Sequence, residues 1–173
     1  MSTIKIWGWD KKKRTMLRFI KSGDIFCFEL KSQQYCFGRI MAKTVVGHIA
    51  EIFDYISSDT FINAEIIEKS SRLMPLIVLD SYTLFDNKRS GDWRIVGHQE
   101  NYTPNDVEDI YFTYGLGSGC KKVDVFGNAT PIHESDQEKY ILLAPRCDEY
   151  IKELVLKTIE QMNETLCNDT SEK

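Results

Sequence analysis

The sequence predicts an α+β fold that is predominantly antiparallel β-sheet and has an amphipathic helix near its C-terminal end. Between Ser22 and Tyr55, three apolar and aromatic runs are separated by connections of only four and five residues, which is typical of an antiparallel meander. From residue 148 to residue 166, apolar side chains instead recur every three or four positions, as they do along one side of a helix. We expect the meander to form part of either a partly open SH3-like barrel or a twisted sheet.

Three strands are expected in the meander, at Ile25–Leu30, Tyr35–Ala42 and His48–Tyr55. Successive side chains of a strand point to opposite faces of the sheet. The first run then has one wholly apolar face and one mixed face. We therefore expect this strand to lie on a core and not inside a two-sided parallel sheet.

After the meander, the sequence predicts a short helix, a short strand and a second hairpin. The helix is expected at Asn63–Arg72, with Asn63 as its N-cap, because asparagine side chains accept hydrogen bonds from first-turn amides. Leu76–Leu79 is a predicted buried strand. The runs Asp80–Asn87 and Trp93–His98 are then expected to pair with each other as the second hairpin.

Two further strands are predicted at Ile110–Tyr114 and Lys121–Phe126, with the glycine-rich segment Gly115–Gly119 between them. Glycine-rich phosphate-binding loops open a helix whose amides face the phosphate. Because this segment precedes a strand, the sequence favours a mobile hairpin loop over a nucleotide site. The C-terminal helix is expected to run to Leu166, with Asp148 as its N-cap.

The length of 173 residues predicts a single domain over residues 1–173, with a basic arm at residues 1–21 and the helix at residues 148–166. The first 22 residues carry seven Lys or Arg and one Asp, a net charge of +6. The remaining residues carry 15 bases and 25 acids, a net charge of −10. The overall charge of −4 therefore conceals a basic arm on an acidic body.

The five cysteines are odd in number and include no CxxC pair, which predicts reduced, buried thiols and a cytoplasmic protein. The N-terminal segment lacks the pattern of a signal peptide, and no apolar run is long enough for a membrane helix. The spacing of the three histidines and the cysteines matches no metal-binding motif. We therefore expect no metal, no cofactor and no membrane association.

The sequence does not predict an enzyme. A catalytic pair of Cys120 with His98 or His133 is the one arrangement to consider, because a thiol needs an adjacent base to become a nucleophile. Two such residues in a chain of this length are weak grounds for catalysis without their geometry.

Acidic side chains form the candidate partner-binding surface. A rigid negative patch speeds the capture of a basic protein and sets its orientation. The alternative is that these residues belong to ordinary solvated loops. The candidate residues are Glu100, Asp106, Glu108, Asp109, Glu134 and Asp136.

The basic arm suggests a second function, a small nucleic-acid-binding β-barrel module. Trp7 and Trp9 could stack on bases while Lys11–Arg14 and Arg18 hold phosphates. The arrangement we favour has both tryptophans packed on the sheet and a solvated charged turn after them. Binding to nucleic acid is therefore not expected.

Seven strings in the same order resemble the bacterial immunity protein 26 family, and together they are more specific than any one of them. They span most of the chain, and the C-terminal helix is the least diagnostic part. The strings are Trp7–Trp9, Ser22–Phe26, Tyr35–Arg39, Gly47–Phe53, Leu79–Phe85, Gly91–His98 and Lys122–Gly127.

The resemblance implies a cytoplasmic immunity protein of a polymorphic toxin system, including the contact-dependent inhibition type. Such a protein protects its own cell by binding a cognate toxin domain and blocking it. The resemblance implies no catalytic residues. It leaves open whether the toxin is a nuclease, a deaminase or another enzyme.

Overall fold

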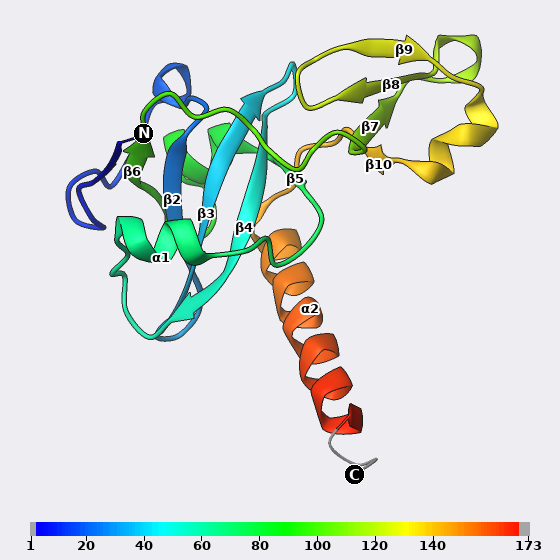
Figure 1. Ribbon diagram of the computed structural model, residues 1–173. Coiled ribbons are helices and arrows are strands. Elements are labelled where there is room, and N and C mark those ends of the chain that lie inside the picture. Colours follow the sequence, from blue (N-terminus) through cyan, green and yellow to red (C-terminus); the bar gives the residue numbers. More distant parts are fainter. Residues whose placement is uncertain (1–2, 170–173) are drawn as a thin grey trace.

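The computed structural model describes residues 3–169, and its largest element is a six-stranded, wholly antiparallel sheet (Figure 1). The strand order is β1-β6-β2-β3-β4-β5. The strands are β1 (Ile4–Ile6), β2 (Asp24–Lys31), β3 (Gln34–Lys43), β4 (His48–Ser57), β5 (Ile77–Leu79) and β6 (Trp93–Gln99). The predicted meander is present as β2, β3 and β4. Because β1 and β5 are edge strands, the sheet is open and not a closed barrel.

A second sheet of four short strands lies beyond one end of the first (Figure 1). Its order is β10-β7-β8-β9, and only the pair of β10 with β7 is parallel. The strands are β7 (Tyr111–Tyr114), β8 (Lys121–Asp124), β9 (Ala129–Pro131) and β10 (Ile141–Leu142). The glycine-rich segment joins the antiparallel strands β7 and β8, so it is a hairpin connection as predicted.

The helices are short except for the last one. They are η1 (Leu17–Phe19), α1 (Ala64–Lys69), the π-helical turn η2 (Tyr82–Asp86), η3 (Gly117–Gly119), η4 (Glu134–Lys139) and α2 (Asp148–Asp169). With mostly antiparallel sheets and a C-terminal helix, the structure confirms the predicted α+β class.

The large sheet is covered on both faces. On one face, η2 and α2 pack over a core in which the rings of Phe28 and Trp93 stack with centroids 3.9 Å apart. On the other face, α1 covers Ile25 and Cys27 of the same strand β2. The first meander strand therefore lies on a core and outside any parallel sheet, as expected, but its mixed face is buried as well. Cys27 is apolar enough, as a buried thiol, to serve in a second core.

The prediction of a second hairpin from residues 80–87 and 93–98 is wrong. Residues Tyr82–Asp86 form a π-helical turn, and β6 pairs with β1 and β2. The adjacent side chains of Leu84 and Phe85 are both fully buried, which an alternating strand on one core does not allow. Asp80 favours the turn because its side-chain Oδ1 accepts from the Thr83 amide at 3.3 Å.

The helix caps could be predicted for one helix and not for the other. Asn63 caps α1 as expected, and its side-chain oxygen accepts from the Ile66 amide at 2.9 Å. In α2 the first helical bond runs from the Ile151 amide to the Cys147 carbonyl, so Cys147 holds the N-cap position instead of Asp148. The Asp148 carboxylate instead accepts from Trp93 Nε1 at 2.6 Å.

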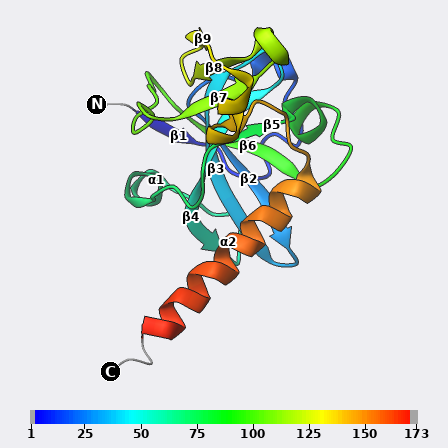
Figure 2. The same ribbon diagram turned by 90° about the vertical axis from the view of Figure 1, so that its right-hand side faces the viewer.

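The apolar stripe on α2 meets the core only as far as Ile159. Ile151 and Val155 are fully buried, whereas Met162 and Leu166 are 49% and 65% exposed. The second half of the helix extends away from the sheets (Figure 2). Tertiary contact therefore stabilises this helix mainly through its first turns.

The cysteines agree in part with the expectation of buried thiols. All five are free; Cys27, Cys36 and Cys120 are buried, whereas Cys147 and Cys167 are exposed.

We predict that Ile151→Ala lowers the free energy of unfolding by about 2 to 5 kcal/mol, because it opens a cavity in the main core. Met162→Ala is the control on the same helix, and we expect a change within about 0.5 kcal/mol. Urea unfolding followed by circular dichroism measures both variants. Equal losses in the two would show that the second half of α2 also packs on the body.

We also predict that acidification weakens the fold through His48, which is 1% exposed and bonds Ser81 Oγ through Nδ1 at 2.8 Å. Burial lowers the pKa of His48 to about 4. The unfolded chain then binds the proton more readily than the folded chain. The contribution of neutral His48 to the free energy of unfolding is therefore complete above pH ~6.5, and it falls by up to about 3 kcal/mol toward pH ~4. Urea unfolding between pH 7 and pH 4.5 should show a shallower pH dependence in His48→Gln. If the free energy of unfolding depends on pH equally in the variant and the wild type, His48 is not the group responsible.

Candidate partner-binding surface

The connection from β6 to β7, residues 100–110, crosses the second face of the large sheet and carries four of the six candidate acids. We call residues 100–109 the acidic loop. Val107 of this loop is buried in a core with Met41 and Ile49 of the sheet. Asn101 and Asp106 both have a φ of +54°, a conformation that asparagine and aspartate tolerate better than most residues. The loop therefore has a defined shape and is attached to the sheet by its own apolar side chain.

A buried ionic cluster lies beneath the acidic loop. Arg39 and Glu51 are directly opposite each other on β3 and β4, and Arg39 Nε donates to Glu51 Oε1 at 2.8 Å. Arg72 donates to the second oxygen of Glu51, from Nε at 3.4 Å and from Nη2 at 3.3 Å. The Glu51 side chain is only 7% exposed. Two guanidinium groups therefore share one buried carboxylate.

The same cluster reaches the acidic loop. Arg72 makes long hydrogen bonds from Nη1 to the Asp106 carbonyl at 3.3 Å and from Nη2 to the Asn105 carbonyl at 3.5 Å. The Arg39 guanidinium lies over the Tyr102 ring, 4.4 Å from its centroid, as in a cation–π contact. These contacts connect the centre of the sheet to the loop backbone.

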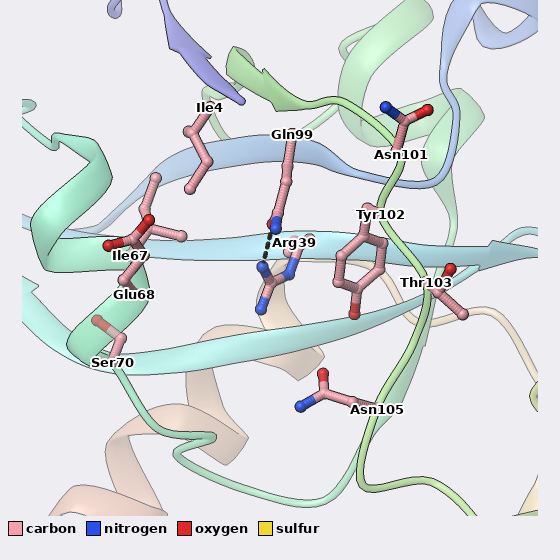
Figure 3. A pocket seen from close by; sticks show the side chains of 10 residues that line it. All are labelled: Ile4, Arg39, Ile67, Glu68, Ser70, Gln99, Asn101, Tyr102, Thr103 and Asn105. Atoms are coloured by element: carbon pink, nitrogen blue, oxygen red, sulfur yellow. Dashed lines mark hydrogen bonds between the residues drawn. The ribbon is translucent and has the colours of Figure 1, made fainter. Parts of the chain in front are cut away.

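A cavity of about 400 Å³ opens between α1 and the acidic loop, with Arg39 at its centre (Figure 3). Arg39 donates to the side-chain oxygen of Gln99 there. The Tyr102 hydroxyl is buried beside the Arg39 guanidinium. Burial and the nearby Glu51 carboxylate raise the pKa of Tyr102 to about 12, so its hydroxyl stays protonated at neutral pH. The cavity is lined by Ile4, Arg39, Ile67, Glu68, Ser70, Gln99, Asn101, Tyr102, Thr103 and Asn105.

The four loop acids differ in their surroundings. Asp106, Glu108 and Asp109 are exposed and form no ion pair with another described residue. Glu100 instead accepts from Lys5 Nζ at 2.5 Å, and this hydrogen bond lowers the pKa of the Glu100 carboxyl. Three unpaired negative charges therefore lie close together in sequence on the loop.

The other two candidate acids lie on η4, beside the small sheet, and not on the acidic loop. Glu134 Oε1 accepts from the Gly117 amide at 3.1 Å. Asp136 pairs with Lys139 at 2.6 Å, and this hydrogen bond lowers the pKa of the Asp136 carboxyl. One amide of the glycine-rich segment is therefore already bonded to a carboxylate of the same chain.

Neither candidate histidine is hydrogen-bonded to Cys120, although the Ile132 amide, next to His133, donates to the Cys120 carbonyl at 3.1 Å. His98 Nδ1 bonds Asp24 at 2.9 Å, and His133 Nδ1 bonds Ser135 at 2.7 Å. Burial raises the pKa of the Cys120 thiol, which disfavours the thiolate that a nucleophile needs.

Two further arrangements bear on catalysis. His48 and Ser81 have the spacing of a base and a nucleophile, but both are 1% exposed, so a substrate cannot reach them. Within residues 3–169, no three His, Cys, Asp or Glu side chains are grouped in a way that could hold a metal ion.

The N-terminal tryptophans pack on the sheet, as in the arrangement that the sequence favours. Trp7 Nε1 donates to the Ile95 carbonyl at 2.8 Å, and Lys12 Nζ lies 4.5 Å from the centre of its ring. Arg94 lies over Trp9, 4.1 Å from the ring centre. The faces on which bases would stack are therefore already in contact with cations of the same chain.

We predict that Glu51→Gln lowers the free energy of unfolding by up to about 3 kcal/mol, the low end of the range for buried pairs, because it leaves two partly buried guanidinium groups without a carboxylate. Glu65→Gln is the matched control, since it removes a carboxylate from the exposed pair with Lys69 and should cost less than about 1 kcal/mol. Urea unfolding at pH 7 measures both. Equal effects would show that the cluster is as well solvated as a surface pair.

Comparison with known proteins gives one result. No curated protein and no solved structure matches the chain. In the described part of the chain, no helix combines the length and the apolar composition needed to cross a bilayer. The family model of immunity protein 26 matches residues 21–124, which include the ionic cluster and the acidic loop but neither η4 nor α2. The match covers more than half of the sequence, and the chain therefore belongs to the immunity protein 26 family.

Proposed function

We propose that this chain is the immunity protein of a bacterial polymorphic toxin or contact-dependent inhibition system, and that it binds and neutralises a cognate toxin domain in the cytoplasm. Its membership of the immunity protein 26 family carries this proposal. The proposed action is binding without catalysis. The burial of His48, Ser81 and Cys120 supports it, because these potential catalytic groups are closed to solvent.

The acidic loop is the proposed contact surface for the toxin. Asp106, Glu108 and Asp109 project negative charge from a loop whose backbone is held by Arg72 and Val107. Charges on a fixed backbone steer an oppositely charged partner and set its orientation at little entropic cost. The corresponding toxin surface is basic. The nucleic-acid groove of a nuclease has this character, and the loop would occupy it as a mimic of phosphate charge.

The direct test is growth rescue. If the coding sequence next to this gene ends in a toxin domain, that domain is expressed from an inducible promoter, with and without this chain. The proposed function requires that co-expression restores growth and that the two purified proteins form a stable complex. Loss of viability in both cultures, with no complex in size-exclusion chromatography, would contradict it.

We predict that the combined change Asp106→Asn, Glu108→Lys and Asp109→Lys slows association with the toxin domain by at least about 10-fold at low salt and flattens its salt dependence. Asparagine is used at position 106 because it tolerates the positive φ. Stopped-flow association at 20 to 300 mM NaCl measures the effect.

The matched control makes the same change in charge on α2, with Glu149→Lys, Glu153→Lys and Glu160→Gln at three exposed positions. It should retain a much larger share of the wild-type association rate. If both triple variants lose the same rate, the overall charge attracts the toxin and the acidic loop has no special place in the contact.

A further inference from the structure

A second cavity, of about 370 Å³, lies where the basic arm meets β6. Its lining residues Trp7 and Ile95 pack on the main core, so it opens on the face of the large sheet that η2 and α2 cover. The cavity beside the acidic loop, lined by Ile4 and Ile67, opens on the opposite face. We call the second one the basic cavity. Its charged or titratable lining residues are Lys5, Lys12, Lys21, Asp24 and His98.

Three of these side chains form a row across neighbouring strands. Lys5 on β1 lies opposite His98 on β6, and His98 lies opposite Asp24 on β2. Residues directly opposite each other on antiparallel strands point to the same face of the sheet. His98 Nδ1 bonds Asp24 Oδ1 at 2.9 Å, and the other oxygen of Asp24 accepts from the Lys21 amide at 2.9 Å. The Asp24 side chain is only 5% exposed, so it fixes the His98 ring and leaves Nε2 as the nitrogen that a ligand can use.

The carboxylates beside this row already have partners. Glu100, which follows β6, accepts from Lys5 Nζ at 2.5 Å. The charge of Asp24 is balanced whenever the His98 ring carries a second proton. Neither carboxylate is therefore available to a further cation of the basic cavity.

Lys12 and Lys21 supply charge that no carboxylate balances. Both residues are exposed, and neither forms an ion pair with another residue of the described range 3–169. Lys12 Nζ lies 4.5 Å from the centre of the Trp7 ring, a contact that positions the ammonium without neutralising it. With Lys5 balanced by Glu100 and Asp24 balanced by protonated His98, the two remaining lysines give the basic cavity a net charge of +2.

A phosphate group with two negative charges matches the basic cavity. Its oxygens accept from several donors at once, and lysine binds phosphate as a point charge. A single carboxylate would leave one lysine unbalanced. A nucleic-acid backbone fits less well, because each of its phosphates carries one charge. The volume of about 370 Å³ lies at the small end of the range for small-molecule sites.

We propose that the basic cavity binds the dianionic phosphate group of a small molecule, which accepts hydrogen bonds from Lys12, Lys21 and protonated His98. The ligand is either inorganic phosphate or a small phosphate monoester, which present the same group. The site lies on the opposite face of the sheet from the acidic loop, so its occupation requires no toxin. The proposal is therefore independent of the proposed function.

The first experiment titrates the isolated full-length protein with inorganic phosphate and with methyl phosphate. Backbone amide resonances are followed by NMR at pH 6.5, and sodium chloride keeps the ionic strength constant. We expect saturable shifts at the amides of Lys12, Lys21, Asp24 and His98. Tighter binding of methyl phosphate identifies a monoester as the ligand, and tighter binding of inorganic phosphate identifies the free ion. The absence of a saturable shift with both probes would overturn the proposal.

The second experiment removes the two unbalanced charges with Lys12→Gln and Lys21→Gln in one variant. Each substitution removes a charge-assisted hydrogen bond, so the affinity for the tighter probe should fall by at least about 10-fold. The matched control is Lys11→Gln with Lys13→Gln, which removes the same charge from exposed positions outside the lining. Its affinity should stay within about 2-fold of the wild type, because water screens more distant charges. Equal losses in both variants, or generic single-stranded RNA that displaces the probe equally well in both, would overturn the site in favour of a diffuse basic surface.

The third experiment tests His98 through the pH dependence of sulfate binding, because sulfate keeps two charges from pH 8 to pH 6. Histidine is the side chain that ordinarily gains a charge in this interval. The charged groups around His98 are Asp24 on β2, Lys5 on β1, Lys21 before β2 and Glu100 after β6. Calorimetry should show an affinity that rises at least about 3-fold as the pH falls, and a much smaller rise in His98→Gln. An affinity that is constant with pH in the wild type would overturn the donation from His98.

Discussion

The ion pair of Arg39 with Glu51 determines how the second face of the large sheet is used. On β3, Arg39 lies between the buried side chains of Phe37 and Met41, and the two strands continue as apolar surface on either side of the pair. One apolar cluster is covered by α1, and the other is covered by the acidic loop and the small sheet. The pair separates the two clusters. The cavity lies between their covers, because a buried charge pair is better left partly hydrated than sealed under apolar side chains.

This arrangement costs stability in comparison with an apolar one. Replacing a buried ion cluster with hydrophobic residues of similar volume is often neutral or stabilising, so folding alone does not require charges here. What the cluster adds is a connection across the fold. Arg72 joins Glu51 to the carbonyls of the acidic loop, and Tyr102 covers Arg39 from the same loop. An apolar replacement would cover the sheet equally well, but it would leave the loop backbone without these hydrogen bonds.

The sequence could predict the local parts of the structure and not the long-range ones. The meander, the Asn63 cap and the first half of α2 follow from patterns within a few residues of each other. The pairing of β6 with β1 and β2 depends on segments about 65 to 95 residues apart, which periodicity does not specify. One feature of the sequence indicates the ionic cluster. Arg39 and Glu51 occupy strand positions whose neighbours two residues away are apolar and buried. Their charged side chains therefore point to the same buried face of the sheet, where charges must be paired. No sequence pattern indicates that Tyr102 and Arg72 join this cluster, because only the tertiary fold brings them to the pair of Arg39 and Glu51.

The acidic loop attracts a partner more readily than it selects one. Long-range attraction to Asp106, Glu108 and Asp109 favours any basic surface, so by itself it discriminates poorly among basic proteins. Selection needs charges at fixed positions, and the loop backbone beneath these acids is held by hydrogen bonds from Arg72 and by the buried side chain of Val107. A partner whose basic groups match those positions pairs with each acid, whereas one whose groups do not match leaves desolvated charges unpaired. The contacts that fix the loop would therefore let one immunity protein discriminate against toxins that share only the overall charge of its own.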